Sequence, residues 1–154
     1  MEQPEVTLTG DDAIVSEVVR ERAASFEARG FEFTGTKLEG SPRLERFPVF
    51  SFLNRQTGLQ IHVSFSSAGA GLNGGFVVTL VNKANRKLDL EDFLKLHGHP
   101  ELTKYFTYRD PKPDIRSFAE SFFDMLDGLL DTDLKPIIDG TTFEETPIDW
   151  MGYR

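Results

Sequence analysis

Near the start of the chain, apolar side chains recur at the spacing of an amphipathic helix. The positions that would form its buried face are Ile14, Val15, Val18, Val19, Ala23 and Phe26. Thr9 is a suitable N-cap with Asp12 three residues later, and Gly30 is a typical residue just beyond a helix end. The sequence therefore predicts an N-terminal helix that ends before Gly30.

From Phe31 onward the apolar period changes from helical spacing to two. Four runs rich in aromatic and β-branched residues read as strands, at 31–38, 47–53, 59–65 and 76–81. Their links are short and turn-like, and such links favour antiparallel neighbours because a parallel crossover needs a dozen or more residues. We therefore expect a four-stranded antiparallel meander with one face covered by helices and the other partly solvated.

The last third of the chain returns to helical patterns. Asp89 or Asp92 is a suitable start for a short helix that Gly98 would end, and Pro100 suits the first turn of another short helix. Asp114 is a suitable N-cap for a longer helix. Its apolar face would contain Ile115, Phe118, Phe122, Met125, Leu126 and Leu129. The predicted fold class is α+β, with an N-terminal helix, a four-stranded meander and C-terminal helices packed on one sheet face.

Composition supports one folded unit over residues 1–154. The 154 residues are 39% hydrophobic and include 14 Phe, which is enough apolar material for a single core. There is no Cys, so disulfides, thiolate metal sites and cysteine nucleophiles are excluded. No residue pattern indicates a bound metal or cofactor, and we expect none.

Charge narrows the range of partners. The formal net charge is −8, which disfavours phosphate backbones and anionic lipid and favours a cationic protein. Residues 1–109 carry a net −1 and residues 110–154 a net −7. The first residues are acidic where a signal peptide would be basic, and no apolar run approaches a membrane span. We expect a cytoplasmic protein.

Two groups of residues could form a catalytic or ligand-binding site, but each has a simpler interpretation. His62, His97 and His99 are candidate metal ligands or bases, yet no nucleophile or further ligand is evident beside them. The glycine-rich segment 67–75 is followed by a strand, whereas a phosphate-binding loop leads into a helix, so we interpret it as a hairpin loop. No catalytic residue is assigned, and we expect a binding protein and not an enzyme.

The acidic C-terminal region is the candidate interaction surface. The side of the predicted helix opposite its apolar face carries Asp124, Asp127 and Asp131. These residues either solvate the helix or form a stripe that binds a partner. Our hypothesis is that they form a continuous negative patch with acids further along, and that aromatic residues anchor the partner. The additional candidates are Glu144, Glu145, Asp149, Trp150 and Tyr153.

The chain resembles bacterial immunity proteins, which neutralise polymorphic or contact-dependent toxins. The resemblance lies in size, acidity, the absence of Cys and the order of helices and strands. The resemblance implies a chain that masks the active site of a cognate, basic toxin. The chain also resembles small acidic secretion chaperones, which would require a homodimer and an exposed apolar patch. A third alternative is a small metal-dependent enzyme, which would require His62, His97 and His99 to converge.

Overall fold

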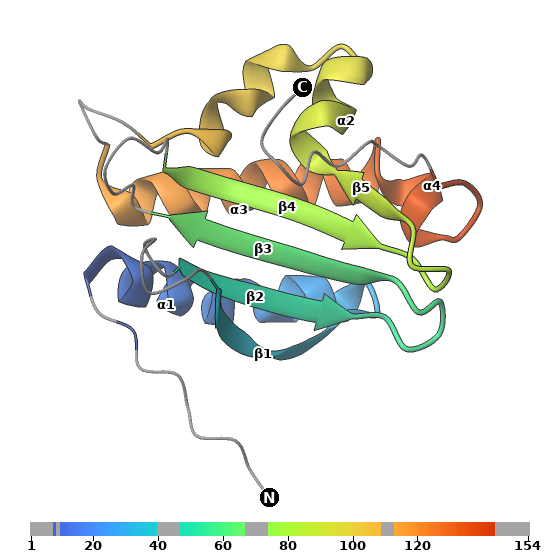
Figure 1. Cartoon of the computed structure of the whole chain (residues 1–154), viewed down its shortest axis with the longest axis horizontal. Coiled ribbons are helices and arrows are strands. Elements are labelled where there is room, and N and C mark those ends of the chain that lie inside the picture. The colour runs from blue at the N-terminus through green and yellow to red at the C-terminus, as the bar shows by residue number, and fades with distance from the viewer. Residues whose placement is uncertain (1–7, 9, 40–46, 67–73, 109–112, 144–154) are drawn as a thin grey trace, which may run out of the picture.

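The structure is a computed structural model, and it describes residues 8, 10–39, 47–66, 74–108 and 113–143. A meander of β-strands follows an N-terminal helix, and the remaining helices follow the sheet (Figure 1). In chain order the elements are α1 (Gly10–Ala28), β1 (Glu32–Glu39), β2 (Phe47–Leu53), β3 (Gln60–Ser66), β4 (Gly75–Val81), β5 (Lys87–Asp89), α2 (Leu90–Leu96), the 3₁₀ helix η1 (Pro100–Phe106), α3 (Ile115–Asp131) and α4 (Lys135–Ile138). The predicted α+β class and helix–sheet–helix order are confirmed.

The sheet is antiparallel throughout, with strand order β1-β2-β3-β4-β5. It has five strands where the sequence predicted four, because residues 87–89 continue the meander before the chain enters α2. Leu88 pairs with Leu80 of β4 and is fully buried. The short hairpin before β5 contains Asn85 with φ of 63°, a left-handed conformation that Asn adopts more readily than most residues.

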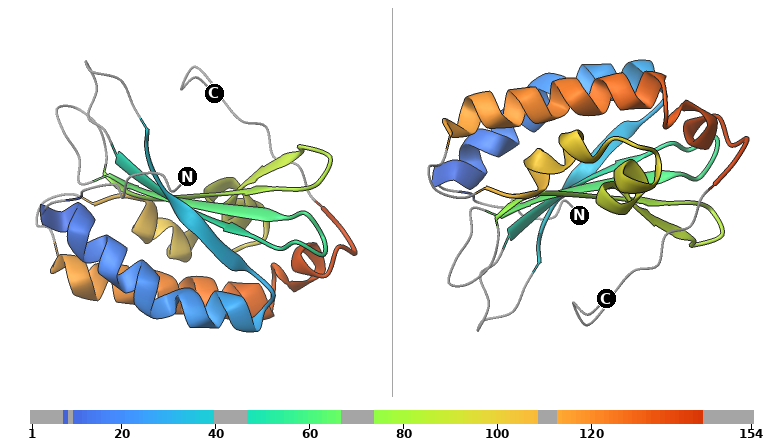
Figure 2. Two further views of the ribbon diagram at one scale, coloured as in Figure 1. Left: turned by 90° about the horizontal axis from the view of Figure 1, so that it is seen from below. Right: turned by 90° about the horizontal axis from the view of Figure 1, so that it is seen from above.

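The two faces of the sheet differ sharply in burial. In β2 and β3, buried and half-buried positions alternate along the strand, as the period of two predicted. Both long helices, α1 and α3, pack on the face that carries the buried residues, so this half of the molecule is a helix layer on a sheet (Figure 2). The opposite face carries partly exposed side chains, and Val77 on it is 47% exposed.

Aromatic rings fill the space between the helix layer and the sheet. Phe76 of β4 stacks on Phe122 of α3, with ring centroids 3.9 Å apart and an interplanar angle of 1°. Phe26 of α1 stacks on Phe52 of β2 at 4.2 Å. The six apolar positions predicted for the first helix are divided, since Val15, Val18, Val19 and Phe26 are buried while Ile14 and Ala23 are half-buried.

Two polar caps fix where the later helices begin. Asp89 accepts a hydrogen bond from the Asp92 amide at 3.1 Å and caps α2, and Asp114 accepts one from the Ser117 amide at 3.0 Å and caps α3. The sequence predicted the Asp114 cap and left Asp89 and Asp92 as alternatives for the start of the shorter helix, and the structure shows Asp89 as its cap. The segment that begins at Pro100 forms a 3₁₀ helix, which lies with α2 beside the β4–β5 edge of the sheet (Figure 1).

The start of β4 passes very close to the end of η1. Gly75 has φ of +127°, and a Cβ there would lie 2.6 Å from the carbonyl carbon of Phe106. The adjacent Gly74 forms a β-bridge with Tyr108. Glycine is therefore required at position 75 for backbone approach as well as for conformation. The preceding part of the glycine-rich segment, residues 67–73, lies outside the described residues.

Candidate functional site

The helices α1 and α3 lie side by side and parallel on one face of the sheet (Figure 2). Polar side chains join the two helices. Three hydrogen-bonded pairs each link residues 102 positions apart: Arg22 with Asp124 (2.6 Å), Ser25 with Asp127 (2.7 Å) and Arg29 with Asp131 (3.0 Å). A constant offset is possible only if both helices run in the same direction, because an antiparallel pair would give a constant sum of residue numbers. The polar face of α3 is therefore matched to α1 turn by turn.

Arg22 and Arg29 each contact two carboxylates. Arg22 lies 2.6 Å from Asp124 and 3.6 Å from Asp127. Arg29 lies 3.2 Å from Asp127 and 2.8 Å from Asp131. The hydrogen bonds from Arg29, together with its positive charge, lower the pKa of Asp131 below its ordinary value of 3.8. Arg29 thus stabilises the ionised form of Asp131.

The same pattern continues at the N-terminal end of α3. Arg116 lies 2.6 Å from Glu21 and 3.5 Å from Glu17, both on α1, and 3.5 Å from Glu120 on its own helix. The hydrogen bond to Glu21, followed by the charges of these carboxylates, raises the pKa of Arg116. One guanidinium is therefore surrounded by three carboxylates.

We call these nine residues the α1–α3 seam. It consists of Glu17, Glu21, Arg22, Arg29, Arg116, Glu120, Asp124, Asp127 and Asp131. Six carboxylates face three guanidiniums, so the seam keeps a net charge of −3 after its internal pairing. Its outer members remain accessible, since the side chains of Asp124 and Glu17 are 69% and 68% exposed. Such a surface can attract cations while its own geometry stays fixed.

The structure adds partners to the predicted acidic stripe. Asp124, Asp127 and Asp131 lie along one line of α3, and each contacts an arginine that the sequence analysis had not paired with it. The physical reason is that α1 packs parallel to α3 and places Arg22 and Arg29 opposite them. The other predicted site residues, Glu144, Glu145, Asp149, Trp150 and Tyr153, lie outside the described residues.

Sequence reasoning missed the contribution of α1. Glu17 and Glu21 both contact Arg116 of α3, although they precede it by 95 or more positions in the chain. Their one signal in the sequence was their place on the polar face of the first helix. That signal could not identify a partner, because the helix packing partner is set by the sheet.

The three histidines occupy separate environments. Nδ1 of His62 lies 2.8 Å from Oγ of Ser51, and its Nε2 lies 2.9 Å from Oε1 of Gln60. His99 contacts Asp133 through Nε2 at 2.9 Å, and the ring of His97 stacks on Phe93 at 4.0 Å. Across the part of the chain that the structure describes, no three or more His, Asp or Glu side chains form a group able to hold a metal ion.

The segment that forms the sheet differs in charge from the two long helices. Residues 32–89 have seven basic and four acidic side chains, net +3, in a chain of net −8. The five strands themselves contain only Lys37 and Lys87 against Glu32, Glu39 and Asp89, so the positive excess belongs to the segments between the strands. The molecule therefore has an acidic helix layer on a sheet whose strands carry almost no net charge.

The other surface features formed by the described residues are small or dispersed. A hollow of about 180 Å³ at the start of α1 is lined by Leu8, Ala13, Ser16, Glu17 and Arg20. It is smaller than the ~300–1,000 Å³ typical of ligand pockets. Among the described residues, the exposed large apolar side chains are Leu38, Val77 and Leu96, on three different elements. None of the described helices combines the length and apolar character needed to cross a membrane.

The α1–α3 seam is thus the most highly organised charged feature among the described residues. Comparisons of the chain with protein-family models, with curated proteins and with solved structures found no match.

Proposed function

We propose that this chain is a protein-binding module that docks a cationic protein on the α1–α3 seam. The observation that carries the proposal is the excess of six carboxylates over three guanidiniums in a line fixed by parallel helices. Fixed carboxylates lose little side-chain freedom when a partner arrives, which favours association. An arginine or lysine of the partner would enter beside the exposed Asp124 or Glu17.

The charge of the whole helix layer supports the same proposal. Within α1 and α3 there are nine acidic and three basic residues, a net −6. A field of one sign over a surface speeds the encounter with an oppositely charged protein and slows encounter with like-charged ones. Cationic proteins would therefore associate with the helix layer faster than other proteins, before any close contact forms.

The more specific form of the proposal is that the chain acts as an immunity protein. A toxin that cleaves nucleic acid needs a basic active-site cleft to hold phosphates. An acidic helix layer would compete with the phosphates for that cleft and occlude it. The mechanism is steric and electrostatic, and requires no catalytic residue in this chain.

The experiment tests protection and binding together. The product of the neighbouring coding sequence is expressed as the candidate toxin, with and without this chain, and cell growth is followed. Growth rescue with direct association of the purified proteins is the expected result. A secreted effector that is not toxic, bound as an extended segment by a dimer of this chain, would instead support the chaperone alternative.

A neutral seam gives the sharper test. Glu17→Gln, Glu120→Gln and Asp124→Asn together remove the three excess charges, while Arg116 keeps Glu21 at 2.6 Å and Arg22 keeps Asp127 at 3.6 Å. We expect the association rate at low salt to fall about three- to tenfold and to depend less on ionic strength. The matched control, Glu39→Gln, Glu91→Gln and Glu101→Gln together, removes three carboxylates outside the seam and should leave the rate nearly unchanged. Equal effects of the two sets would place the interface elsewhere.

A further inference from the structure

The sheet face opposite the helix layer carries a serine hydroxyl that is hydrogen-bonded to a histidine. Ser51 of β2 pairs with His62 of β3, and Oγ of Ser51 lies 2.8 Å from Nδ1 of His62. On the other side of the ring, Nε2 lies 2.9 Å from Oε1 of Gln60. An amide oxygen can only accept, so Nε2 donates to it and Nδ1 accepts from the Ser51 hydroxyl. The ring nitrogen beside Ser51 is therefore the one that can take a proton.

These three side chains are related as a nucleophile, a general base and a group that orients the base. A hydroxyl becomes a useful nucleophile when an adjacent base can remove its proton and a third group holds that base in one tautomer and orientation. His62 is the adjacent base, and Gln60 is the residue that positions it. The sequence showed no nucleophile beside His62, because Ser51 lies 11 positions earlier and only strand pairing brings the two together.

The strand position on the other side of Ser51 is open. Gly35 of β1 pairs with Ser51, and nothing lies within 4 Å of the place that a Cβ would take at Gly35. The pairing register shifts between Phe33 and Gly35, and the Thr34 hydroxyl in this β-bulge donates to the Ser51 carbonyl at 3.1 Å. β-Bulges are common next to active sites, where they re-aim a side chain. The bulge thus holds the Ser51 backbone and leaves room beside its hydroxyl for the carbonyl group of a ligand.

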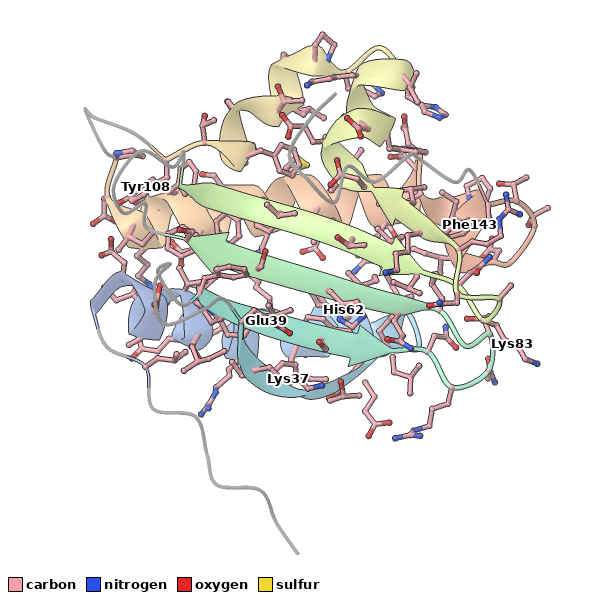
Figure 3. All side chains as sticks on the ribbon, viewed as in Figure 1. Lys37, Glu39, His62, Lys83, Tyr108 and Phe143 are labelled. Carbon is pink, nitrogen blue, oxygen red and sulfur yellow. The ribbon has the colours of Figure 1, made fainter. Side chains whose placement is uncertain are left out.

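Charges on this face favour the neutral imidazole that a general base requires. Burial first, and then the positive charges of Lys37 and Lys87, lower the pKa of His62 below 6.5. Figure 3 shows Lys37, Glu39 and His62 over the sheet on the side away from α3. The carboxylates on the same face are those of Glu32, Glu39 and Asp89. Because the lowering effects prevail, His62 is predominantly neutral above 6.5.

We propose that Ser51 is a reactive serine that accepts the acyl group of an activated ester. Oγ of Ser51 attacks the carbonyl carbon of the ester, and the hydroxyl proton passes to Nδ1 of His62. The bond from Oγ to the carbonyl carbon forms, and the bond from that carbon to the leaving oxygen breaks. The proton then moves from Nδ1 to the leaving oxygen. The products are an acyl ester on Ser51, a released alcohol and a neutral His62.

Lys37 lies where it can stabilise the negative charge that develops on the carbonyl oxygen. It is two residues beyond Gly35 on the same face of β1, which places it diagonally across from Ser51. Diagonal neighbours in a sheet are within reach of long side chains. A fixed positive charge beside a developing oxyanion lowers the barrier to acyl transfer. This site is on the other side of the sheet from the α1–α3 seam, so it does not depend on the docking proposed there (Figure 2).

The test uses the full chain, with p-nitrophenyl acetate as the acyl donor. Release of p-nitrophenolate gives the overall rate, and mass spectrometry of peptides shows which side chains carry the acetyl group. Ser64 is the matched control, because it lies on the same face of the sheet and its hydroxyl contacts the Val77 carbonyl at 3.5 Å. We expect Ser51 to be acetylated at least about tenfold faster than Ser64. Equal rates at the two serines, or acetyl groups on lysines alone, would overturn the proposal.

Variants separate the roles of the neighbouring residues. His62→Gln removes the base and should lower the acetylation rate of Ser51 at least about tenfold. Gln60→Ala should lower it less, because the imidazole remains but loses its fixed orientation. Lys37→Gln should lower the rate about two- to fivefold, whereas Lys104→Gln, on η1, should not change it. An unchanged rate in His62→Gln would show that Ser51 is not activated by the histidine.

The dependence on pH separates general-base catalysis from the background reaction. Uncatalysed acylation of a hydroxyl continues to accelerate as pH rises, because it uses the ionised hydroxyl. With His62 as the base, the rate at Ser51 should instead rise through the folded-state pKa of His62 and become constant above 6.5. A rate that keeps rising equally in the wild type and in His62→Gln would overturn the proposal. The neutral-seam variant should react at the wild-type rate, so failure of either proposal leaves the other standing.

Discussion

Arg29 at the end of α1 contacts Asp131 at the end of α3 with two parallel hydrogen bonds. Nε donates to Oδ1 at 3.0 Å and Nη2 donates to Oδ2 at 2.8 Å. The same guanidinium donates to Asp127 at 3.2 Å, so one side chain connects two successive turns of α3 to the end of α1. This contact fixes the axial alignment of the helices and hence the line of carboxylates in the seam.

Asp127 should contribute more to stability than Asp124. Asp127 accepts from Ser25 at 2.7 Å and its side chain is only 24% exposed, whereas that of Asp124 is 69% exposed. We expect Asp127→Ala to lower the free energy of unfolding by about 1.5–3 kcal/mol, because partly buried donors lose a charged acceptor. Asp124→Ala should cost no more than about 0.5 kcal/mol. Urea denaturation of both variants checks the order, and equal losses would contradict it.

Two glycine-to-alanine changes should have opposite effects. Gly75→Ala places a methyl group 2.6 Å from backbone atoms of Phe106 at a φ of +127°, so we expect a loss of at least about 1–3 kcal/mol. Gly128 lies within α3, and nothing lies within 4 Å of the place that a methyl group would take there, so Gly128→Ala should gain about 0.5–1 kcal/mol. Thermal unfolding of the pair measures both. A stabilising Gly75→Ala would show that the η1–β4 contact is not close.

Truncation of Phe76 should lower the free energy of unfolding more than truncation of any other aromatic residue. Its ring contacts Phe65, Phe118, Phe122 and Phe123, with centroids between 3.9 and 6.0 Å away. Phe76→Ala should cost about 3–5 kcal/mol, because it removes buried area and leaves a cavity. Phe76→Leu is the milder comparison and should retain the fold at a smaller cost. Similar losses for both variants in urea denaturation would argue against close stacking at this position.

The pKa of His62 predicts how stability changes with pH. The folded chain binds the His62 proton more weakly than the unfolded chain, whose pKa is near 6.5. The contribution of His62 is therefore complete above 6.5 and declines as pH falls through 6.5 towards the folded-state pKa. Urea denaturation between about pH 7.5 and 5 should show this decline, and His62→Gln should remove that part of it. An unchanged slope in the variant would assign the pH dependence to other groups.

Much of the secondary structure followed from local signals. Asp114 was predicted as an N-cap, and Asp89 as one of two candidates with Asp92, because a short polar side chain before an apolar helical pattern satisfies the first free amides. Asp89 and Asp114 both do so. The alternation in β2 and β3 likewise matched their burial. The strand β5 was missed because Lys87–Asp89 has room for only one buried residue, Leu88, which gives no period to detect.

The sequence by itself determined where the long helices and the four longer strands form, which face of each is apolar, and that the chain carries a net −8. Those properties depend on neighbours within a turn or a strand. Only the tertiary structure decided that α1 and α3 run parallel and that Arg22 and Arg29 contact the aspartates of α3. Residues 102 positions apart meet because both helices must bury an apolar face on the same side of one sheet, and no local pattern encodes that choice.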